Sequence, residues 1–191
     1  MLMIVLSSVP AGIAGVLLMK TNWAERLFSD PVVTGMAFLV TGAVLRLTSK
    51  EKLVPDQENT VGVKEISWKQ ALIVGVVQMF ALLPGISRSG STISAGLFCG
   101  IKREDAAAFS FLLALPAVGG ATLLELLSMS GESGAFNCPV WQIICSVVFS
   151  FLVSLGALTC VVKIVKKSKL SAFSWYLFAL GAAVLVWQIA F

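Results

Sequence analysis

The polar stretch PGISRSGST, at residues 84–92, decides how the middle of this chain folds. An apolar segment, residues 68–83, precedes it, and apolar character returns after it up to Ile101. Proline has no backbone N–H, and glycine adopts conformations that are closed to other residues, so Pro84-Gly85 is predicted to break the helix. The stretch therefore predicts a helical hairpin at residues 68–101 with a polar turn at 84–92.

The whole chain is too apolar for a water-soluble protein. Of its 191 residues, 58% are hydrophobic and 13% are charged, and the mean hydropathy is +0.94. A soluble domain carries about 25% charged residues, so lipid must be the solvent for much of this surface. We therefore expect an all-α polytopic membrane protein in which residues 1–191 form a single transmembrane domain.

The charge and the absence of histidine exclude several functions. The net charge of +4 is modest and gathers in particular loops, which argues against nucleic acid as a partner. The sequence contains no histidine, so a histidine base, a phosphohistidine and a histidine-ligated metal are excluded. The four cysteines show no C-x-x-C spacing. No metal-ligating residues are predicted.

Five further apolar stretches are candidates for crossing a bilayer. A spanning helix needs roughly 17–25 mainly apolar residues. About five transmembrane helices are therefore predicted in addition to the hairpin, at residues 1–19, 32–47, 106–127, 140–162 and 170–191.

The distribution of basic residues suggests how the hairpin sits in the membrane. Basic residues gather at 46–69, 102–103 and 163–169, whereas the loop at 128–139 has none. Basic loops are retained in the cytoplasm, and placing all three groups there requires residues 68–101 to enter and leave on the same side. The segment is then a re-entrant hairpin. The alternative is one broken span, which would move residues 46–69 to the outer side against the charge count.

Arg88, in the polar turn, is the strongest candidate for a functional residue. An arginine at membrane depth costs about 2.5–3.5 kcal/mol on insertion scales, which suggests a compensating anionic partner. Gly85 and Gly90 permit positive φ and let a ligand approach the backbone. A helix beginning near Thr92 would point its free N–H groups at the same place.

The hydroxyl groups of the turn complete an anion site, with phosphate as the favoured ligand. Four neutral donors lie in nine residues: Ser87, Ser89, Ser91 and Thr92. The alternative interpretation is that Arg88 extends to the membrane interface while the serines cap a helix break. Two glycines and four hydroxyls in so short a stretch favour the anion site.

Two other polar residues are weaker candidates. Gln78 lies about one helical turn before the break, where it faces either the site or a neighbouring helix in a hydrogen bond. Glu125 lies near the end of a predicted span, which favours exposure at the interface over a role inside the membrane.

The segment QMFALLPGISRSGST, residues 78–92, resembles the undecaprenyl-diphosphate phosphatase (bacitracin-resistance protein) family of bacteria. The resemblance continues through Gly100, Arg103 and residues 106–108 to FSFLLALP at 109–116. It extends over essentially the whole chain, aligned with the later two thirds of the family.

The resemblance implies a multi-pass protein of the bacterial cytoplasmic (inner) membrane with an inverted-repeat fold. The implied activity removes one phosphate from undecaprenyl diphosphate, which recycles the lipid carrier for cell-wall synthesis and confers bacitracin resistance. The implied cofactor is Mg²⁺ or Ca²⁺. The expected partners are the lipid substrate and membrane lipids, and a homodimer is one oligomeric state that stays open. The catalytic candidates are Arg88 and Ser87. The substrate-binding candidates are Gly85, Ser89, Gly90, Ser91, Thr92 and Gln78.

The sequence also departs from the family pattern. Family members open with a hairpin that carries a glutamate-rich motif and a Ser-Ser-Thr-Gly-His segment, and this chain has neither. We expect the chain to be a fragment, to have a misassigned start or to be degenerate. Two other classes of function stay open: a lipid-phosphate transporter or flippase, and a non-catalytic membrane remnant.

Overall fold

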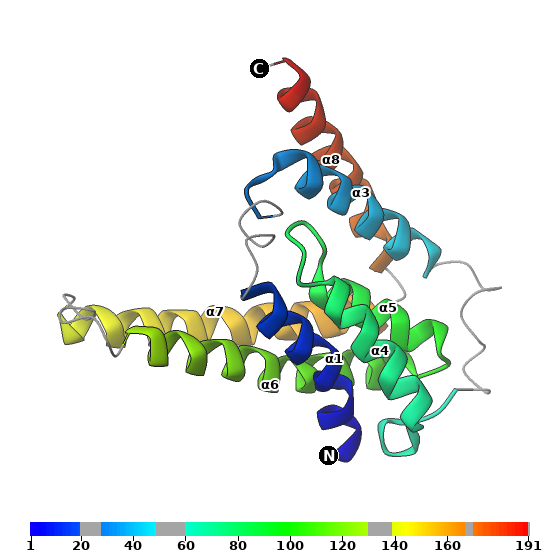
Figure 1. Ribbon diagram of the computed structural model, residues 1–191. Helices are drawn as coiled ribbons and strands as arrows, with labels where there is room; N and C mark the ends of the chain where they lie inside the picture. The colour runs from blue at the N-terminus through cyan, green and yellow to red at the C-terminus, as the bar shows by residue number, and fades with distance from the viewer. Residues whose placement is uncertain (20–27, 49–59, 130–138, 167–169, 191) are drawn as a thin grey trace.

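The computed structural model describes residues 1–19, 28–48, 60–129, 139–166 and 170–190, which are mostly helical (Figure 1). Most of the predicted loop at 128–139 lies outside these residues. The α-helices in the described part are α1 (Leu2–Met19), α3 (Pro31–Leu47), α4 (Trp68–Phe80), α5 (Arg88–Phe98), α6 (Arg103–Met129), α7 (Val140–Lys166) and α8 (Phe173–Ala190), with short 3₁₀ helices η2 (Val63–Glu65) and η3 (Leu170–Ala172). Every predicted apolar span is thus a helix.

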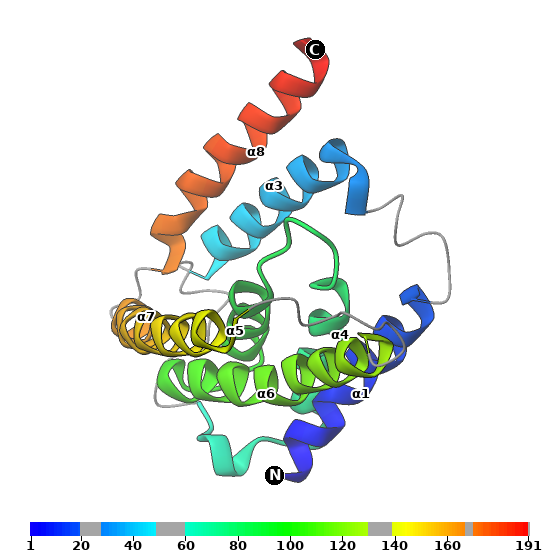
Figure 2. The same ribbon diagram turned by 90° about the vertical axis from the view of Figure 1, so that its left-hand side faces the viewer.

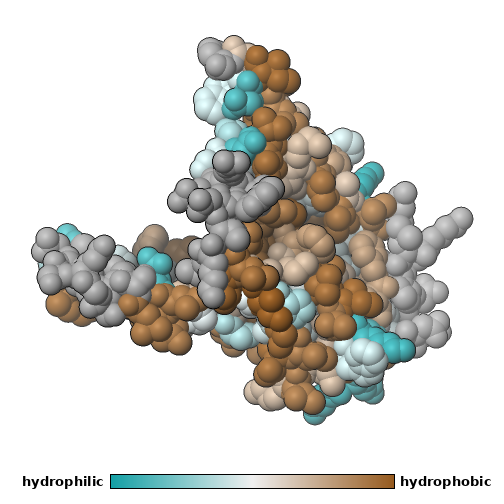
Figure 3. All heavy atoms as spheres, viewed as in Figure 1, coloured by the Kyte–Doolittle hydropathy of each residue, from teal (hydrophilic) through white to brown (hydrophobic). Residues whose placement is uncertain are grey.

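The length and apolar composition of these helices are those of a membrane protein. Three of them are long and apolar enough to cross a bilayer: α6, α7 and the segment Leu170–Ala190, which contains α8. The helices α1 and α3 are equally apolar but shorter. Hydrophobic residues cover most of the face seen in Figure 3. The predicted polytopic all-α membrane fold is confirmed.

The helices α4 and α5 form the predicted hairpin, and its two ends meet. The N–H of Val61 donates to the carbonyl of Gly100 at 2.9 Å, and the N–H of Lys102 donates to the carbonyl of Val61 at 3.0 Å. Gln70, in the first turn of α4, donates from Nε2 to the carbonyl of Cys99 at the end of α5. The chain therefore leaves and returns at one place, as a re-entrant segment requires.

The helices α3 and α8 form a closely packed antiparallel pair (Figure 1). Gly35 faces Leu185 and Gly181, while Gly42 faces Phe178 and the carbonyl of Ser174, with no room for a Cβ at either glycine. Small residues let two helix backbones approach closely, which is a common packing mode in membranes.

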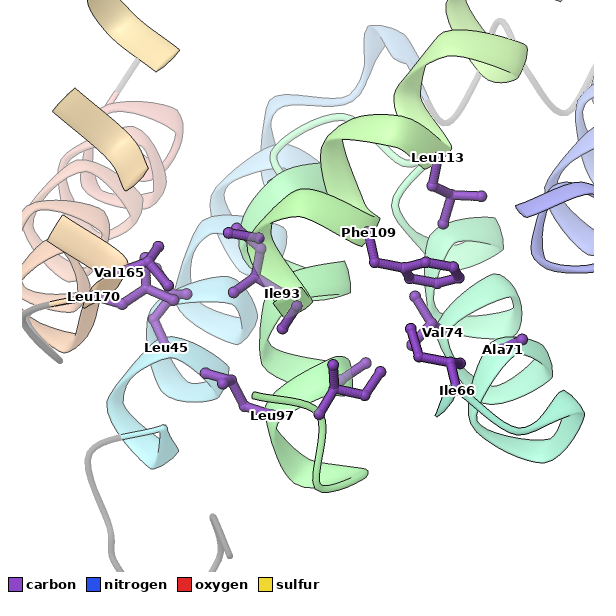
Figure 4. Close-up of a cluster of buried hydrophobic side chains, with 14 residues drawn as sticks. Leu45, Ile66, Ala71, Val74, Ile93, Leu97, Phe109, Leu113, Val165 and Leu170 are labelled. Carbon is purple, nitrogen blue, oxygen red and sulfur yellow. The ribbon is translucent and has the colours of Figure 1, made fainter. Parts of the chain in front are cut away.

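The buried core lies where the hairpin meets its neighbours (Figure 4). Phe109 and Leu113 of α6 pack near Val74 of α4 on one side of α5, while Leu45 of α3 lies near Val165 and Leu170 on the other side. The hairpin is therefore the centre of the described structure.

Residues 115–127 of α6 and 140–160 of α7, which are mostly exposed, form an arm that extends from this core. Figures 1 and 2 show the two helices side by side, and Figure 1 shows the arm projecting from the rest of the molecule. Residues 140–160 of α7 are all exposed within the chain, although most of them are apolar. Such a surface is compatible with lipid and not with water.

Some of the predicted boundaries are wrong. The first helix of the hairpin ends at Phe80 and not at Leu83, and the second begins at Arg88 and not near Thr92. The helix α6 begins at Arg103, three residues before the predicted span. At α5 the N-cap Ser87, described below, sets the start of the helix ahead of the apolar pattern.

Candidate functional site

The hairpin tip is a tight turn whose sequence explains its shape. The N–H of Ile86 donates to the carbonyl of Leu83 at 3.2 Å, which closes a four-residue turn around Pro84-Gly85. Proline sets the φ of the first central position, and the second central position of a type II turn requires positive φ. Gly85 has a φ of +87°. The pair Pro84-Gly85 therefore forms the break that the sequence predicts.

Gly85 faces α3 and not an open space. A Cβ on Gly85 would approach the carbonyl oxygen of Thr34 to 2.5 Å and the Cβ of Ala37 to 2.9 Å. The absence of a side chain at Gly85 therefore lets α3 approach the turn. The prediction was that a ligand would approach the backbone there.

Thr41 of α3 holds the turn from the same side. Its Oγ1 donates to the carbonyl of Gly85 and accepts from the N–H of Ser87, both at 3.3 Å. Thr41 is buried, so these two bonds satisfy backbone groups that water cannot reach. Sequence analysis missed Thr41; its only signal is a hydroxyl within an otherwise apolar helix.

Ser87 is the N-cap of α5. Its Oγ accepts the N–H of Gly90 at 3.2 Å, which is the usual role of serine at this position. Gly90 is consequently helical, and the expected positive φ at Gly90 is wrong. The N–H groups of Arg88 and Ser89 precede the helical hydrogen-bond pattern and form the positive end of the helix dipole.

Thr92 is directed into the protein. Its Oγ1 lies 2.6 Å from Oγ of Ser110 on α6 and donates to the carbonyl of Arg88 at 2.8 Å. Both side chains are buried. The structure therefore separates Thr92 from the phosphate-facing role expected of it and gives it a contact between α5 and α6. Ser110 is a second residue that sequence analysis missed.

Ser91 lines a different space from Arg88. It contributes to a cavity of about 340 Å³ between α3, α4 and α5, whose other lining residues are almost all apolar. Ser89 is half-buried.

Arg88 and Gln78 both line a larger cavity, of about 720 Å³, between α1, α4 and α6. The lining includes five polar side chains, from α1, the hairpin and α6; they are Ser8, Gln78, Arg88, Thr122 and Glu125. Arg88 is half-buried, and no acidic side chain within the described residues pairs with it. An unneutralised guanidinium beside a cavity favours an anion.

Gln78 is the least satisfied polar side chain near the cavity. It is 2% exposed, and within the described part of the chain neither Nε2 nor Oε1 has a hydrogen-bond partner. A buried polar group without a partner costs about 1–3 kcal/mol, so native proteins retain one where a ligand or water completes it. Of the predicted binding residues, the structure thus brings Gln78 and Arg88 together.

The described residues do not form a site for a divalent cation. They contain no group of three or more histidine, cysteine, aspartate or glutamate side chains, and Glu125 is the only carboxylate that lines the larger cavity. Ca²⁺ takes six to eight oxygen ligands and Mg²⁺ demands near-octahedral geometry. The residues present do not fit the implied Mg²⁺ or Ca²⁺ by themselves.

Comparison with known proteins assigns the family. The family model described as bacitracin resistance protein BacA matches residues 1–183. The chain belongs to the BacA family. Within this family it is similar to proteins named undecaprenyl-diphosphatase. It is 40% identical to the one from Desulfatibacillum aliphaticivorans over 97% of this chain and 63% of that protein.

Other BacA relatives show that the match differs in extent. The chain is 38% identical to the undecaprenyl-diphosphatase of Desulforapulum autotrophicum over 94% of this chain and 61% of that protein. It is 36% identical to that of Methanothermobacter thermautotrophicus over 96% of this chain and 97% of that protein. The chain thus spans less than two thirds of the first two relatives and nearly all of the third.

Proposed function

We propose that this chain binds undecaprenyl diphosphate and takes part in its hydrolysis to undecaprenyl phosphate and phosphate. The observation that carries the proposal is the cavity at which Arg88 and the unsatisfied Gln78 meet. Membership of the BacA family and the names of the relatives support the same substrate.

The geometry suggests what each residue does in this reaction. Hydrolysis breaks the bridging P–O bond of the diphosphate and adds water, and negative charge develops on the oxygen that stays with the lipid. Arg88 presents two parallel N–H donors to the phosphate oxygens and neutralises that charge. The amide of Gln78 donates from Nε2 to the same group or to the attacking water.

The serines at the start of α5 complete the proposal. The N–H groups of Arg88 and Ser89 and the hydroxyl of Ser89 add further donors at the helix N-terminus. The Oγ of Ser87 already accepts an N–H from Gly90, so its own proton is directed to another acceptor, for which a phosphate oxygen is suited. Attack needs an activated nucleophile, either a serine hydroxyl or water.

Several finer assignments belong to the same proposal. We place the protein in the bacterial cytoplasmic (inner) membrane, and we include self-association as a homodimer. For Mg²⁺ or Ca²⁺, the proposal requires ligands from outside the described residues.

Substitution of Arg88 tests the proposal directly. Arg88→Ala is expected to lower phosphate release from undecaprenyl diphosphate in detergent micelles by at least about 100-fold, the usual effect of removing one preorganised donor. Arg88→Lys is also expected to be poor, because an ammonium cannot form the two parallel bonds. The matched control is Arg46→Lys, since Arg46 lies over the Trp175 ring at 5.6 Å and does not line the cavity. Wild-type turnover in Arg88→Ala contradicts the proposal.

Reconstituted vesicles separate the alternative functions. Phosphate release supports hydrolysis, whereas movement of the lipid diphosphate across the bilayer without phosphate release identifies a transporter. If the wild-type chain does neither and inorganic diphosphate does not bind, the chain is a non-catalytic membrane protein and the proposal is wrong.

A further inference from the structure

One face of α3 follows the hairpin from its turn into the start of α5. The face consists of residues spaced three or four apart, which lie on one side of a helix: Thr34, Ala37, Thr41 and Leu45. The first two leave no room for a Cβ on Gly85, and the last lies near Gly90. Between them, Thr41 bonds to the carbonyl of Gly85 and to the N–H of Ser87. This face of α3 therefore supports the turn and the first residues of α5.

A chain of hydroxyl groups reaches the same part of α5 from α6. The Oγ1 of Thr92 donates to the carbonyl of Arg88 at 2.8 Å and lies 2.6 Å from the Oγ of Ser110. A hydroxyl group has one proton, so the proton between Thr92 and Ser110 comes from Ser110. Hydrogen bonds in such a chain strengthen one another, and burial of both side chains keeps water from competing.

These two contacts hold the backbone on either side of the Arg88 Cα. Thr41 fixes the N–H of Ser87, and the chain from Ser110 fixes the carbonyl of Arg88 itself. No acidic side chain among the described residues pairs with the guanidinium, so its place at the larger cavity depends on where this piece of backbone lies. Two parallel bonds to a phosphate require placement within about 0.5 Å, and a displacement of about 1 Å can cost roughly 100-fold.

We propose that Thr41 and Ser110 are positioning residues for diphosphate binding, and that both act through Arg88. Neither of the two lines the larger cavity. Each hydroxyl already donates its proton within the protein, so neither is a donor for the ligand. The inference rests on the proposed function and adds to it two residues, outside the hairpin, that set the place of its arginine.

Removal of either hydroxyl tests this inference, and the measurement is the Kd of inorganic diphosphate for the full chain in detergent. Thr41→Val keeps the shape of the side chain and is expected to weaken binding by about tenfold, which corresponds to about 1.4 kcal/mol. Thr41→Ser keeps the hydroxyl and should recover most of the affinity. Ser110→Ala should weaken binding by about threefold, because Thr92 still bonds to the carbonyl of Arg88.

A substitution at Arg88 shows whether Thr41 acts through it. In Arg88→Lys, the ammonium is a point charge on a flexible stem and does not depend on a fixed orientation. Thr41→Val is therefore expected to weaken binding less in the Arg88→Lys background than in the wild type, by about threefold in place of about tenfold. A general loss of structure would lower both affinities by the same factor.

Ser174→Ala is the matched control. Ser174 of α8 is also buried, and its hydroxyl donates to the carbonyl of Ser171 at 2.6 Å. The substitution removes a buried hydroxyl, as the two test variants do, but this hydrogen bond does not involve the hairpin. The Kd of inorganic diphosphate should therefore not change. Circular dichroism reports whether each detergent-solubilised variant is folded.

The outcomes separate this inference from the proposed function. If folded Thr41→Val and Ser110→Ala both bind inorganic diphosphate as the wild type does, the two hydroxyls do not position Arg88 and the inference is wrong. An equal loss in both Arg88 backgrounds, or an equal loss in Ser174→Ala, also overturns it. These results leave the proposed function standing. If the wild type does not bind inorganic diphosphate, or Arg88→Ala binds it as tightly, the proposed function is wrong and this inference falls with it.

Discussion

The α4–α5 hairpin and the α6–α7 arm use glycine in opposite ways. In the hairpin, a Cβ on Gly75 would collide with the backbone of Ser7, and one on Gly85 would collide with the carbonyl of Thr34. In the arm, Gly119 and Gly156 would meet nothing within 4 Å. The same residue therefore marks close backbone contact in one region and open surroundings in the other.

Hydroxyl groups show the same difference. Three neighbouring helices each hold the hairpin through one hydroxyl: Ser7 of α1 donates to the carbonyl of Ala71, Thr41 of α3 bonds to the turn, and Ser110 of α6 bonds to Thr92. In the arm, by contrast, the hydroxyl of Thr159 donates to the carbonyl of Leu155 in its own helix. The hydrophobic effect does little to join helices inside a membrane, because lipid is as apolar as the side chains. Hydrogen bonds and close backbone contacts therefore hold the hairpin against its neighbours, whereas the three residues of the arm named above make no such contact with a neighbouring helix.

The largest effect is expected at Gly85. Gly85→Ala combines a left-handed backbone with a collision against α3, and the expected loss of stability is about 2–5 kcal/mol. Thermal unfolding in detergent measures it, with Gly119→Ala as the control that has open surroundings. A melting temperature equal to that of the wild type would show that the turn is not held against α3.

A smaller effect is expected at Thr41. Thr41→Val removes a donor and an acceptor but keeps the shape, leaving the carbonyl of Gly85 and the N–H of Ser87 without a partner. The expected loss is about 1–3 kcal/mol in the same unfolding measurement. Thr41→Ser retains the hydroxyl and should recover most of the stability; if it does not, the methyl group and not the hydrogen bonds holds the turn.

Ser110 should matter less than Thr41. After Ser110→Ala, Thr92 still bonds to the carbonyl of Arg88, so the expected loss is about 0.5–1.5 kcal/mol. Ser154→Ala, at an exposed position of α7, is the matched control and should leave the unfolding temperature unchanged. Equal effects at both positions would remove the distinction between hairpin and arm.

The smallest effect, and one of opposite sign, is expected in the arm. Gly156→Ala adds a methyl group where nothing stands in its way and improves helix propensity, so it should stabilise the protein by up to about 1 kcal/mol. Gly75→Ala is the same substitution on α4 and should destabilise, because its Cβ meets the backbone of Ser7. A comparison of the two unfolding temperatures gives the sign of each change.

The sequence predicts the elements well because apolar runs and Pro84-Gly85 are local signals. It misplaces the start of α5 because Ser87 caps that helix, so five residues assigned to the turn, Arg88 to Thr92, belong to the helix. It assigns Thr92 to the ligand because nothing local reveals Ser110, eighteen residues away. The sequence does predict that Arg88 and Gln78 belong to one site, because both lie within a turn or so of the break at Pro84-Gly85.

The role of Thr41 depends on a contact between distant segments. Thr41 meets Ser87 across 46 positions of the sequence, and no periodicity reports such a pairing. Likewise, Gly119 and Gly120 are neighbours in the sequence, and only Gly120 lines the larger cavity of the folded chain.

The backbone bridge at Val61 predicts on which side of the membrane the later helices lie. Because Val61 bonds to both Gly100 and Lys102, the two ends of the hairpin lie together, and we expect no net crossing of the bilayer between Lys64 and Lys102. An amine reagent that cannot permeate a sealed vesicle should therefore modify both lysines from the same face. If both lysines are modified from the same face, a topology map that counts α4 and α5 as one crossing would invert the orientation of α6, α7 and α8.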